Sequence, residues 1–284
     1  MSQLTQSLRD RVRSWKNYSI QQYLSYRLYH HSDPYRIAFR QRPYRVLWML
    51  SHMRSGSSLL THILNTNPDI AGYGETHICY QSSEDFKKLL FKVYWQAKEY
   101  RNFSDLQDLA LSETYILDKL LHNNKLTDLN LLDSSSMNCI FLIREPKRTL
   151  NSIRDLKPNW SEEETLYYYC KRLEGLVSYA EKIDSPARSL LIEHDQLINE
   201  TTSVFEALKH FLGTEVGFSE EYQLLKTTGA KHVGDHRGNI LSGQIVRTPR
   251  KLNETVSPAS IEQAQVVYEN CRDRLLQLTS SIFN

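Results

Sequence analysis

Short apolar runs alternate with longer segments of helical periodicity along most of the chain. The apolar runs predict buried β-strands at Arg45–Leu50, Leu129–Leu132, Cys139–Ile143 and Ser189–Ile192. Helical spacing and end signals predict helices over residues 3–30, Ser57–Asn65, 83–125 with an interruption near Asn102, Ser161–Ile183, Glu200–Leu212 and Pro258–Leu278. Because strands that alternate with helices are typical of βαβ units, we predict an α/β fold with a central parallel sheet flanked by helices.

Several of these boundaries carry a residue with a strong local preference. Ser161 is followed by three glutamates, which is a signature of a helix N-terminus. Asn67 and Pro68 stop the second helix, Pro146 suits the first turn of a helix, and Gly213 ends another. No internal repeat, low-complexity tract or Pro/Gly/Ser-rich linker interrupts the 284 residues, so we expect one domain.

The charged residues are distributed unevenly. The net charge is +2, but residues 1–45 hold nine Arg or Lys and two Asp, which gives 9 − 2 = +7 there and −5 over the remainder. We expect residues 1–44 to form a basic helical extension packed on a domain of residues 45–284. Such a helix is either a solvated face or an arm for an acidic partner, a membrane surface or an anionic substrate. We interpret its interleaved tyrosines as packing residues and expect no nucleic-acid partner: Tyr18, Tyr23, Tyr26 and Tyr29.

The cysteine and histidine patterns argue against several classes of site. The four cysteines are widely spaced and form no Cys-x-x-Cys pair, which is typical of a reducing cytoplasm rather than a zinc site or a disulfide scaffold. The ten histidines show no metal-ligand spacing, so we expect no metal. There is no apolar leader and no run of about 18 apolar residues, so we expect neither export nor a spanning helix.

The most informative stretch joins the strand at Arg45–Leu50 to the helix that begins at Ser57. Between them lies a small, polar and cationic turn. The orphan N–H groups of a helix's first turn and the helix dipole both favour a bound phosphate or sulfate. Small residues let the backbone approach such an anion, and an arginine adds positive charge. We therefore expect an anion site made by Arg54, Ser55, Gly56, Ser57, Ser58 and Leu59.

A second strand-turn-helix unit, Cys139–Asp155, places Arg144 at the end of a strand. Arg144 and Pro146 are followed by Ser152 in an R-x-P-x5-S spacing. Ligands of parallel sheets bind at the carboxyl ends of the strands, where both cationic turns fall. Two anion sites on one sheet predict a ligand with separated phosphate or sulfate groups. The first turn is not a Walker A loop, because it lacks the GxxxxGK[ST] spacing and its lysine.

Taken together, the two turns resemble those of the sulfotransferases that use 3′-phosphoadenosine 5′-phosphosulfate (PAPS). Residues 52–58 resemble the family's phosphosulfate loop, and Ile143–Pro146 with Ser152 resemble its 3′-phosphate motif. The Arg-Ser-Gly-Ser form is similar to bacterial and carbohydrate-type members. The resemblance covers roughly residues 45–245. It implies a P-loop NTPase-like sulfotransferase fold, PAPS as donor, 3′-phosphoadenosine 5′-phosphate (PAP) as product, and no metal.

Three further segments follow the family's order, each with a departure. Leu132–Ser136 looks like a segment that usually ends in Lys-Ser/Thr-Pro but has no lysine, and Asp133 would be a structural helper. Leu190–Leu197 looks like a strand followed by Tyr-Glu-Asp-Leu, with His194 in place of the tyrosine. Residues 234–239 look like the late glycine-rich loop that closes over the nucleotide, but they lack the Arg-Lys-Gly start seen in cytosolic members. The resemblance implies donor contacts from this region by Lys231, Arg237 and Gly238.

The resemblance also implies roles in sulfuryl transfer, which depends on positioning and electrostatics. Arg54 would support the leaving oxygen, while Arg144 and Ser152 would clamp the 3′-phosphate. Glu75 ends a Gly-Tyr-Gly-Glu turn and resembles the glutamate that takes the acceptor proton in bacterial and carbohydrate-type members. The alternatives for this base are His77 and His52.

The acceptor expected from these features is a small molecule with a hydroxyl or an amine, such as a bacterial natural product or a carbohydrate. Gln81–Asn124 and Tyr167–Tyr169 either build its pocket or pack the core. Two other classes of protein stay open. A P-loop kinase or NTPase would bind ATP with magnesium, and a non-catalytic nucleotide-binding protein would need no base.

Overall fold

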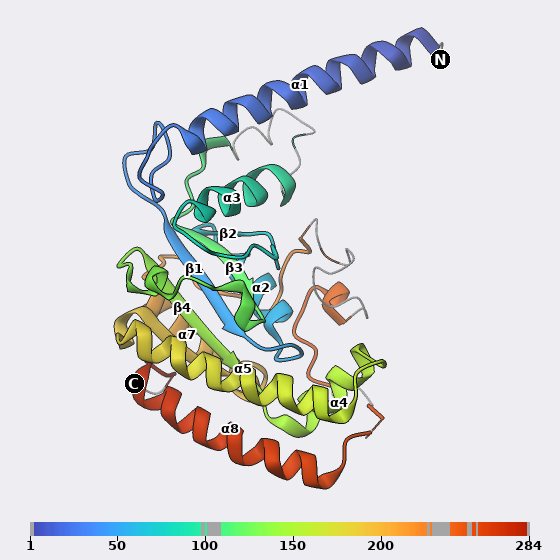
Figure 1. Cartoon of the computed structure of the whole chain (residues 1–284). Coiled ribbons are helices and arrows are strands. Elements are labelled where there is room, and N and C mark those ends of the chain that lie inside the picture. The colour runs from blue at the N-terminus through green and yellow to red at the C-terminus, as the bar shows by residue number, and fades with distance from the viewer. Residues whose placement is uncertain are drawn as a thin grey trace.

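The structure is a computed structural model that describes residues 3–97, 100, 109–225, 228, 239–248, 252–253 and 255–282. One sheet of five parallel strands lies at its centre, in the order β2-β3-β1-β4-β5 (Figure 1). The strands are β1 (Arg45–Ser51), β2 (Ile70–Gly72), β3 (Tyr115–Leu120), β4 (Met137–Ile143) and β5 (Ser189–Glu193). The predicted α/β fold with a parallel central sheet is confirmed.

Helices cover both faces of this sheet. One face packs against α1 (Gln3–Tyr29), α3 (Asp85–Phe91), α4 (Pro146–Leu156), α5 (Glu162–Ile183) and α8 (Pro258–Leu278). The other packs against α2 (Ser57–Leu64), α6 (His194–Asn199) and α7 (Thr201–Leu212). Figure 1 shows α5 and α8 side by side along the sheet. A sheet covered on both faces has strands that are buried throughout, and every residue of β4 is buried.

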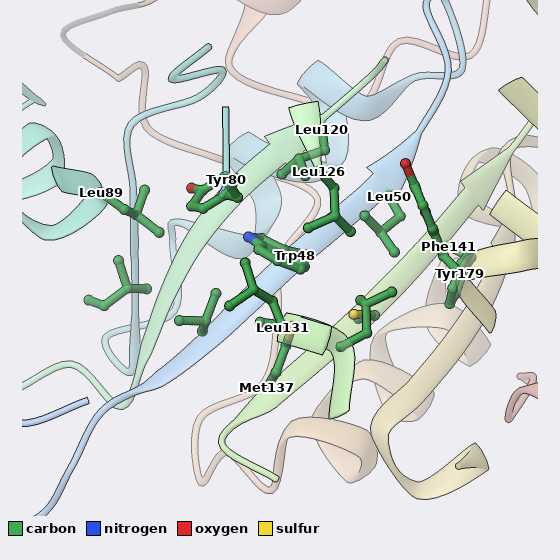
Figure 2. Packing of buried hydrophobic residues seen from close by; sticks show 14 of the residues in the cluster. Trp48, Leu50, Tyr80, Leu89, Leu120, Leu126, Leu131, Met137, Phe141 and Tyr179 are labelled. Atoms are coloured by element: carbon green, nitrogen blue, oxygen red, sulfur yellow. The ribbon is translucent and has the colours of Figure 1, made fainter. Parts of the chain in front are cut away.

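The central strand β1 divides its side chains between two hydrophobic clusters. Val46, Trp48 and Leu50 face the α5 side, whereas Leu47 and Met49 face the α2 side. Figure 2 shows Trp48 in the first cluster, where its ring lies 5.0 Å from that of Tyr80 between centroids. Figure 2 also labels Leu50, Leu89, Leu120, Leu126, Leu131, Met137, Phe141 and Tyr179 in that cluster. This double burial fixes the carboxyl end of β1, where the first cationic turn begins.

Most helix ends fall where the local sequence signals predict them. Ser161 and Glu164 form a reciprocal capping box at the start of α5. Pro146 and Pro258 occupy the first turns of α4 and α8. Gly213 ends α7 with φ +63°, a conformation that glycine adopts without steric cost.

Two predicted elements were wrong, and one strand was missed. Residues 83–125 are not helical throughout, because residues 115–120 form β3, an inner strand whose side chains are all buried. Leu129–Leu132 is not a strand. It belongs to a 3₁₀ helix, Leu129–Asp133, which Asp128 caps by accepting from the Asn130 N–H. The sequence also gave no signal for β2, which is too short for a periodic pattern.

The helix α1 packs on the rest of the chain through its second half. Ile20, Leu24 and Leu28 are buried, and Arg27 donates to the carbonyl oxygens of Ala38 and Leu109. The interleaved tyrosines do not pack as predicted, since all four are between 40% and 61% exposed. The division into residues 1–44 and 45–284 stays a prediction. In the part of the chain that the structure describes, no helix is long and apolar enough to cross a membrane.

Candidate active site

The first cationic turn connects the buried end of β1 to the N-terminus of α2. Gly56 has φ +94° and stands at the N-cap of α2, where no side chain caps the helix. A Cβ atom on Gly56 would also lie 2.6 Å from Cδ2 of His194. Both the backbone conformation and the neighbouring side chain therefore require glycine at this position. Arg54 also has a positive φ, +64°, which is uncommon for a residue with a side chain. The turn thus leaves the first N–H groups of α2 open towards the space above the sheet.

The two predicted anion turns lie next to each other because β1 and β4 are adjacent parallel strands. The Arg144 side chain donates from Nη1 to the Arg54 carbonyl oxygen at 3.1 Å. Its backbone N–H donates to Nε2 of His52 at 3.0 Å. Burial lowers the pKa of Arg144 to about 10, so the guanidinium still carries its charge at neutral pH. Tyr169 completes the arrangement by donating from its hydroxyl to the Arg144 carbonyl at 2.7 Å.

Ser152 connects the two motifs through a side chain. Its Oγ accepts a hydrogen bond from Nε of Arg54 at 2.7 Å, although the two residues are 98 positions apart in the chain. Ser152 lies on the second turn of α4, and it is 4% exposed. The sequence resemblance places Arg54 in the phosphosulfate turn and Ser152 in the 3′-phosphate motif. In the structure the two side chains meet, so this hydrogen bond joins the two motifs.

His52 is occupied as a structural bridge. It is fully buried; Nε2 accepts from the Arg144 N–H, and Nδ1 lies 2.9 Å from the Met53 carbonyl oxygen, to which it donates. Burial lowers the pKa of His52 to about 3. The positive charges of Arg172 and Arg144 lower this pKa further, whereas the hydrogen bond to the Met53 carbonyl opposes the shift. Since both ring nitrogens are used, the geometry gives no support to His52 as a base.

Glu75 lines the same cavity as Arg144, lies in a turn after β2, and is 8% exposed. Its Oε2 stands 3.8 Å from Nζ of Lys119, and its Oε1 stands 3.4 Å from Nδ1 of His77. Lys119 in turn donates to Oγ of Ser58, at the N-terminus of α2, at 3.3 Å. The predicted base and the predicted phosphosulfate turn are therefore connected through one lysine.

Lys119 is a candidate functional residue that the sequence reasoning missed. It lies near the carboxyl end of β3, and its side chain is 1% exposed. Burial lowers its pKa, opposed by Glu75 and Asp118. Its signal in the sequence is a lysine next to the end of an apolar run, Tyr115–Leu117, which the helical prediction for this region concealed.

Asp118 holds the Glu75 turn in place. It accepts from the N–H and hydroxyl of Thr76 at 3.1 and 2.6 Å, and from the hydroxyl of Tyr80 at 2.7 Å. Burial raises its pKa, and these hydrogen bonds oppose that rise. Asp118 therefore fixes the backbone immediately after Glu75.

The other acidic candidate, Asp133, lies apart from the site. Its carboxylate pairs with Lys182 at 2.8 Å, and its side chain is 52% exposed. Asp133 is not among the described residues that line the cavity.

One cavity of about 1000 Å³ contains both turns and Glu75. That volume is at the upper end of the usual range for ligand sites, about 300–1,000 Å³. Nine of the predicted site residues line it together with Lys119: Arg54, Gly56, Ser57, Ser58, Leu59, Glu75, His77, Arg144 and Ser152. Ser55 points away and makes a 2.6 Å hydroxyl contact with Ser51. Lys231, Arg237 and Gly238 lie outside the described residues.

Part of the cavity wall is apolar. Met53, Leu121 and Leu156 line it, and they belong to one hydrophobic cluster with Tyr168. The Tyr168 hydroxyl accepts from the Met53 N–H and donates to the Leu121 carbonyl, both at 2.8 Å. Of the tyrosine patch predicted for the acceptor, Tyr168 supports this wall, Tyr169 packs in the core, and Tyr167 is 67% exposed.

No cluster of metal-ligating side chains is found in the described parts of the chain.

Comparisons with known proteins relate this architecture to one fold. No protein-family model matches the chain, and no curated protein matches it in sequence. Among solved structures, a sulfotransferase domain from the curacin biosynthetic pathway is similar, with 14% identity and a TM-score of 0.53 over 82% of this chain and 99% of that one. A sulfotransferase domain from the olefin synthase of Synechococcus PCC 7002 is similar, with 15% identity and a TM-score of 0.50 over 82% and 97%. The chain has the fold of these domains, as the sequence resemblance implies.

Proposed function

We propose that the chain is a sulfotransferase that moves a sulfuryl group from PAPS to a hydroxyl or amine of a small-molecule acceptor. One observation carries this proposal: two cationic turns end adjacent parallel strands and open into the same cavity. PAPS has one anionic group at its 5′ end and another at its 3′ position, and each would meet one turn.

The residues of both turns fit such a donor. The first N–H groups of α2 have no capping side chain, so the 5′-phosphosulfate would bind there. Arg144 and Ser152 would hold the 3′-phosphate. Arg54 would contact both groups, because its guanidinium lies against Ser152 while its backbone belongs to the first turn. Lys231, Arg237 and Gly238 remain proposed donor contacts on the resemblance alone.

The reaction would take place between Glu75 and the N-terminus of α2. The acceptor oxygen or nitrogen forms a bond to sulfur while the bond between sulfur and the bridging phosphate oxygen breaks. Glu75 takes the acceptor's proton on a carboxylate oxygen. Lys119 lies between Glu75 and Ser58, where its ammonium would face the sulfuryl oxygens and stabilise their charge. His77 remains the alternative base.

The wall of Met53, Leu121 and Leu156 would receive the apolar part of the acceptor, since it lines the same cavity as Glu75. A bacterial natural product or a carbohydrate is the acceptor class that we propose. We place the reaction in the cytoplasm, in keeping with four cysteines that are all free.

Donor binding is the first test of this function. PAP should stabilise the full chain against heat without metal, by about 2.7 kcal/mol at a hundredfold excess over its dissociation constant. AMP lacks the 3′-phosphate and should give a much smaller shift at the same concentration. Equal shifts for the two nucleotides would contradict the two-turn assignment. A larger shift with ATP and magnesium than with PAP would favour a kinase or NTPase instead.

Transfer is the second test. A library of hydroxyl and amine acceptors incubated with PAPS should contain members that gain one sulfuryl group by mass spectrometry. The matched control is Glu75→Gln, which should keep the PAP shift and lose most of the transfer. Binding of PAP with no transfer to any acceptor would assign the chain to the non-catalytic nucleotide-binding proteins.

A further inference from the structure

Exposed aromatic side chains are concentrated in one part of the molecule. Among the described residues, seven Phe, Trp or Tyr side chains are exposed, and six of them lie within residues 15–39; the seventh is Tyr167. Val12, 66% exposed, precedes this group on the same helix. We call this surface the α1 outer face, defined by Val12, Trp15, Tyr18, Tyr23, Tyr26, Tyr29 and Phe39.

The α1 outer face lies opposite the side of the helix that packs on the domain. Ile20, Leu24 and Leu28 recur every four residues and are at most 6% exposed. At about 100° per residue, Trp15 and Tyr26 project on the opposite side of the helix from Leu24. Figure 1 shows α1 extending away from the sheet towards its N-terminus. Residues 10–15 are therefore exposed to the surroundings, while Ile20, Leu24 and Leu28 anchor the second half of the helix.

Phe39 extends this face from outside the helix. It is 77% exposed, and its φ is +63°, an outlier for a bulky side chain. Its ring lies 6.0 Å from that of Tyr26 and 5.6 Å from the guanidinium carbon of Arg27. Strained backbone of this kind is typical of functional surfaces. In this conformation the Phe39 ring is exposed to solvent and lies beside the ring of Tyr26.

The segment that carries the α1 outer face is strongly positive in sequence. Residues 1–45 carry +7, whereas the remainder of the chain carries −5. Arg11 and Arg13 are both exposed, and Arg11 precedes Trp15 by four residues, which places the two side chains on neighbouring turns. A helix with aromatic residues on one side and flanking cations is typical of helices that lie at the surface of a lipid bilayer.

We propose that the α1 outer face binds an anionic lipid surface, with α1 lying in the plane of the headgroups. Trp and Tyr are the side chains most enriched at that depth, and they dominate this face. A second copy of the chain is the weaker occupant, because paired α1 helices would bring together the same cations. An acidic protein would complement the cations but would not account for the exposed aromatic residues of the α1 outer face.

Vesicle binding by the full chain tests this proposal. The chain should cosediment with vesicles that contain phosphatidylglycerol and much less with pure phosphatidylcholine vesicles, and the binding should weaken as salt rises. Trp15→Ala combined with Phe39→Ala should reduce binding by about tenfold or more. Arg11→Glu combined with Arg13→Glu should also reduce vesicle binding by about tenfold or more, since each cation near the membrane surface contributes to the binding free energy. Tyr167→Ala, the matched exposed aromatic elsewhere, should bind as the unchanged chain does.

Tryptophan fluorescence gives an independent readout. Anionic vesicles should shift the emission of the chain to the blue, and Trp15→Phe should abolish most of that shift, because Trp15 is the one tryptophan on the α1 outer face, while Trp48 is buried and Trp95 and Trp160 are partly buried. Equal binding to neutral and anionic vesicles, or no binding, would overturn the proposal. So would a concentration-dependent dimer that the Trp15 and Phe39 pair of substitutions dissociates, which would assign the face to a second copy. Circular dichroism establishes that each variant is folded.

Discussion

Cations and aromatic rings gather at two places in this molecule, and they are held there in different ways. In the cavity, Arg144 donates to a backbone carbonyl, and Lys119 is 3% exposed between Glu75 and Ser58. On the α1 outer face, Trp15 is 72% exposed and stands one turn from an exposed arginine. Tertiary contacts fix the first set, whereas most of the second set is exposed along one helix.

The difference teaches what each surface can recognise. A charge held in a partly desolvated cavity acts on a ligand at low effective dielectric and in one geometry, so it can discriminate between phosphate positions. An exposed charge is screened over about 10 Å at 0.1 M salt and acts as part of a field. We therefore expect substitutions in the cavity to have large, specific effects, and substitutions on α1 to have small effects on fold and catalysis.

The largest effect that would test this contrast is loss of turnover in Glu75→Gln. A positioned base contributes about 10²–10⁴-fold to rate, and Glu75 is buried beside Lys119. Steady-state transfer should fall by that factor while the PAP thermal shift stays. Acceptors whose nucleophile is already deprotonated should lose less. If turnover stays near normal, His77→Ala is the next variant, since the role would then belong to His77 or to no protein group.

Donor affinity gives the next effect in size. Arg144→Ala should weaken PAP binding by about 2–4 kcal/mol, because a buried, charge-assisted contact is removed. Isothermal calorimetry measures this loss. Arg11→Ala removes an equal charge from α1 and should leave PAP affinity unchanged at physiological salt. Similar losses in the two variants would show that PAP responds to the overall field and not to the cavity geometry.

Acid should destabilise the chain through histidines that are buried in neutral form around the cavity. Burial lowers the pKa of His52 and of His194 to about 3 and that of His122 to about 4, from 6.5 in the unfolded chain. Below pH 6.5 the unfolded state therefore binds more protons, and stability falls towards the folded-state values. His52 alone should contribute about 1.4 kcal/mol per pH unit in that window.

Unfolding in urea between pH 7.5 and 5 measures this slope. His52→Gln keeps an acceptor for the Arg144 N–H but does not titrate, so it should reduce the slope by about one proton. The unchanged chain, measured in parallel, is the reference for that slope. An unchanged slope in His52→Gln would mean that His52 can be protonated in the folded chain.

The smallest effect is expected on the α1 outer face. Trp15→Ala should change the free energy of unfolding by no more than about 0.5 kcal/mol, because an exposed side chain makes few contacts to lose. The contrasting variant is Trp48→Ala in the core, which should cost about 3–5 kcal/mol. Chemical denaturation of both variants measures the difference. A large loss in Trp15→Ala would mean that α1 packs through this residue, against the assignment of the outer face.

Local patterns along the chain determine much of this architecture. The apolar runs at β1, β4 and β5 locate three strands, because doubly buried strands need continuous apolar residues. The capping box at Ser161 and the glycine at 213 locate helix ends, since they act on backbone groups within one turn. Both cationic turns can be recognised from the sequence for the same reason, because each is a short segment between a strand and a helix.

Tertiary structure alone decides which residues meet. The register of β1 against β4 brings Arg54 to Ser152 across 98 positions, and the pairing of β3 with β1 delivers Lys119 to Glu75. No pattern in a single segment encodes these contacts, because they depend on which strands become neighbours. For the same reason, the sequence places tyrosines along α1, but only packing decides that Leu24 turns inward and Tyr26 outward. A helix has periodicity of its own, whereas its inside and outside exist only once a partner surface has covered one face.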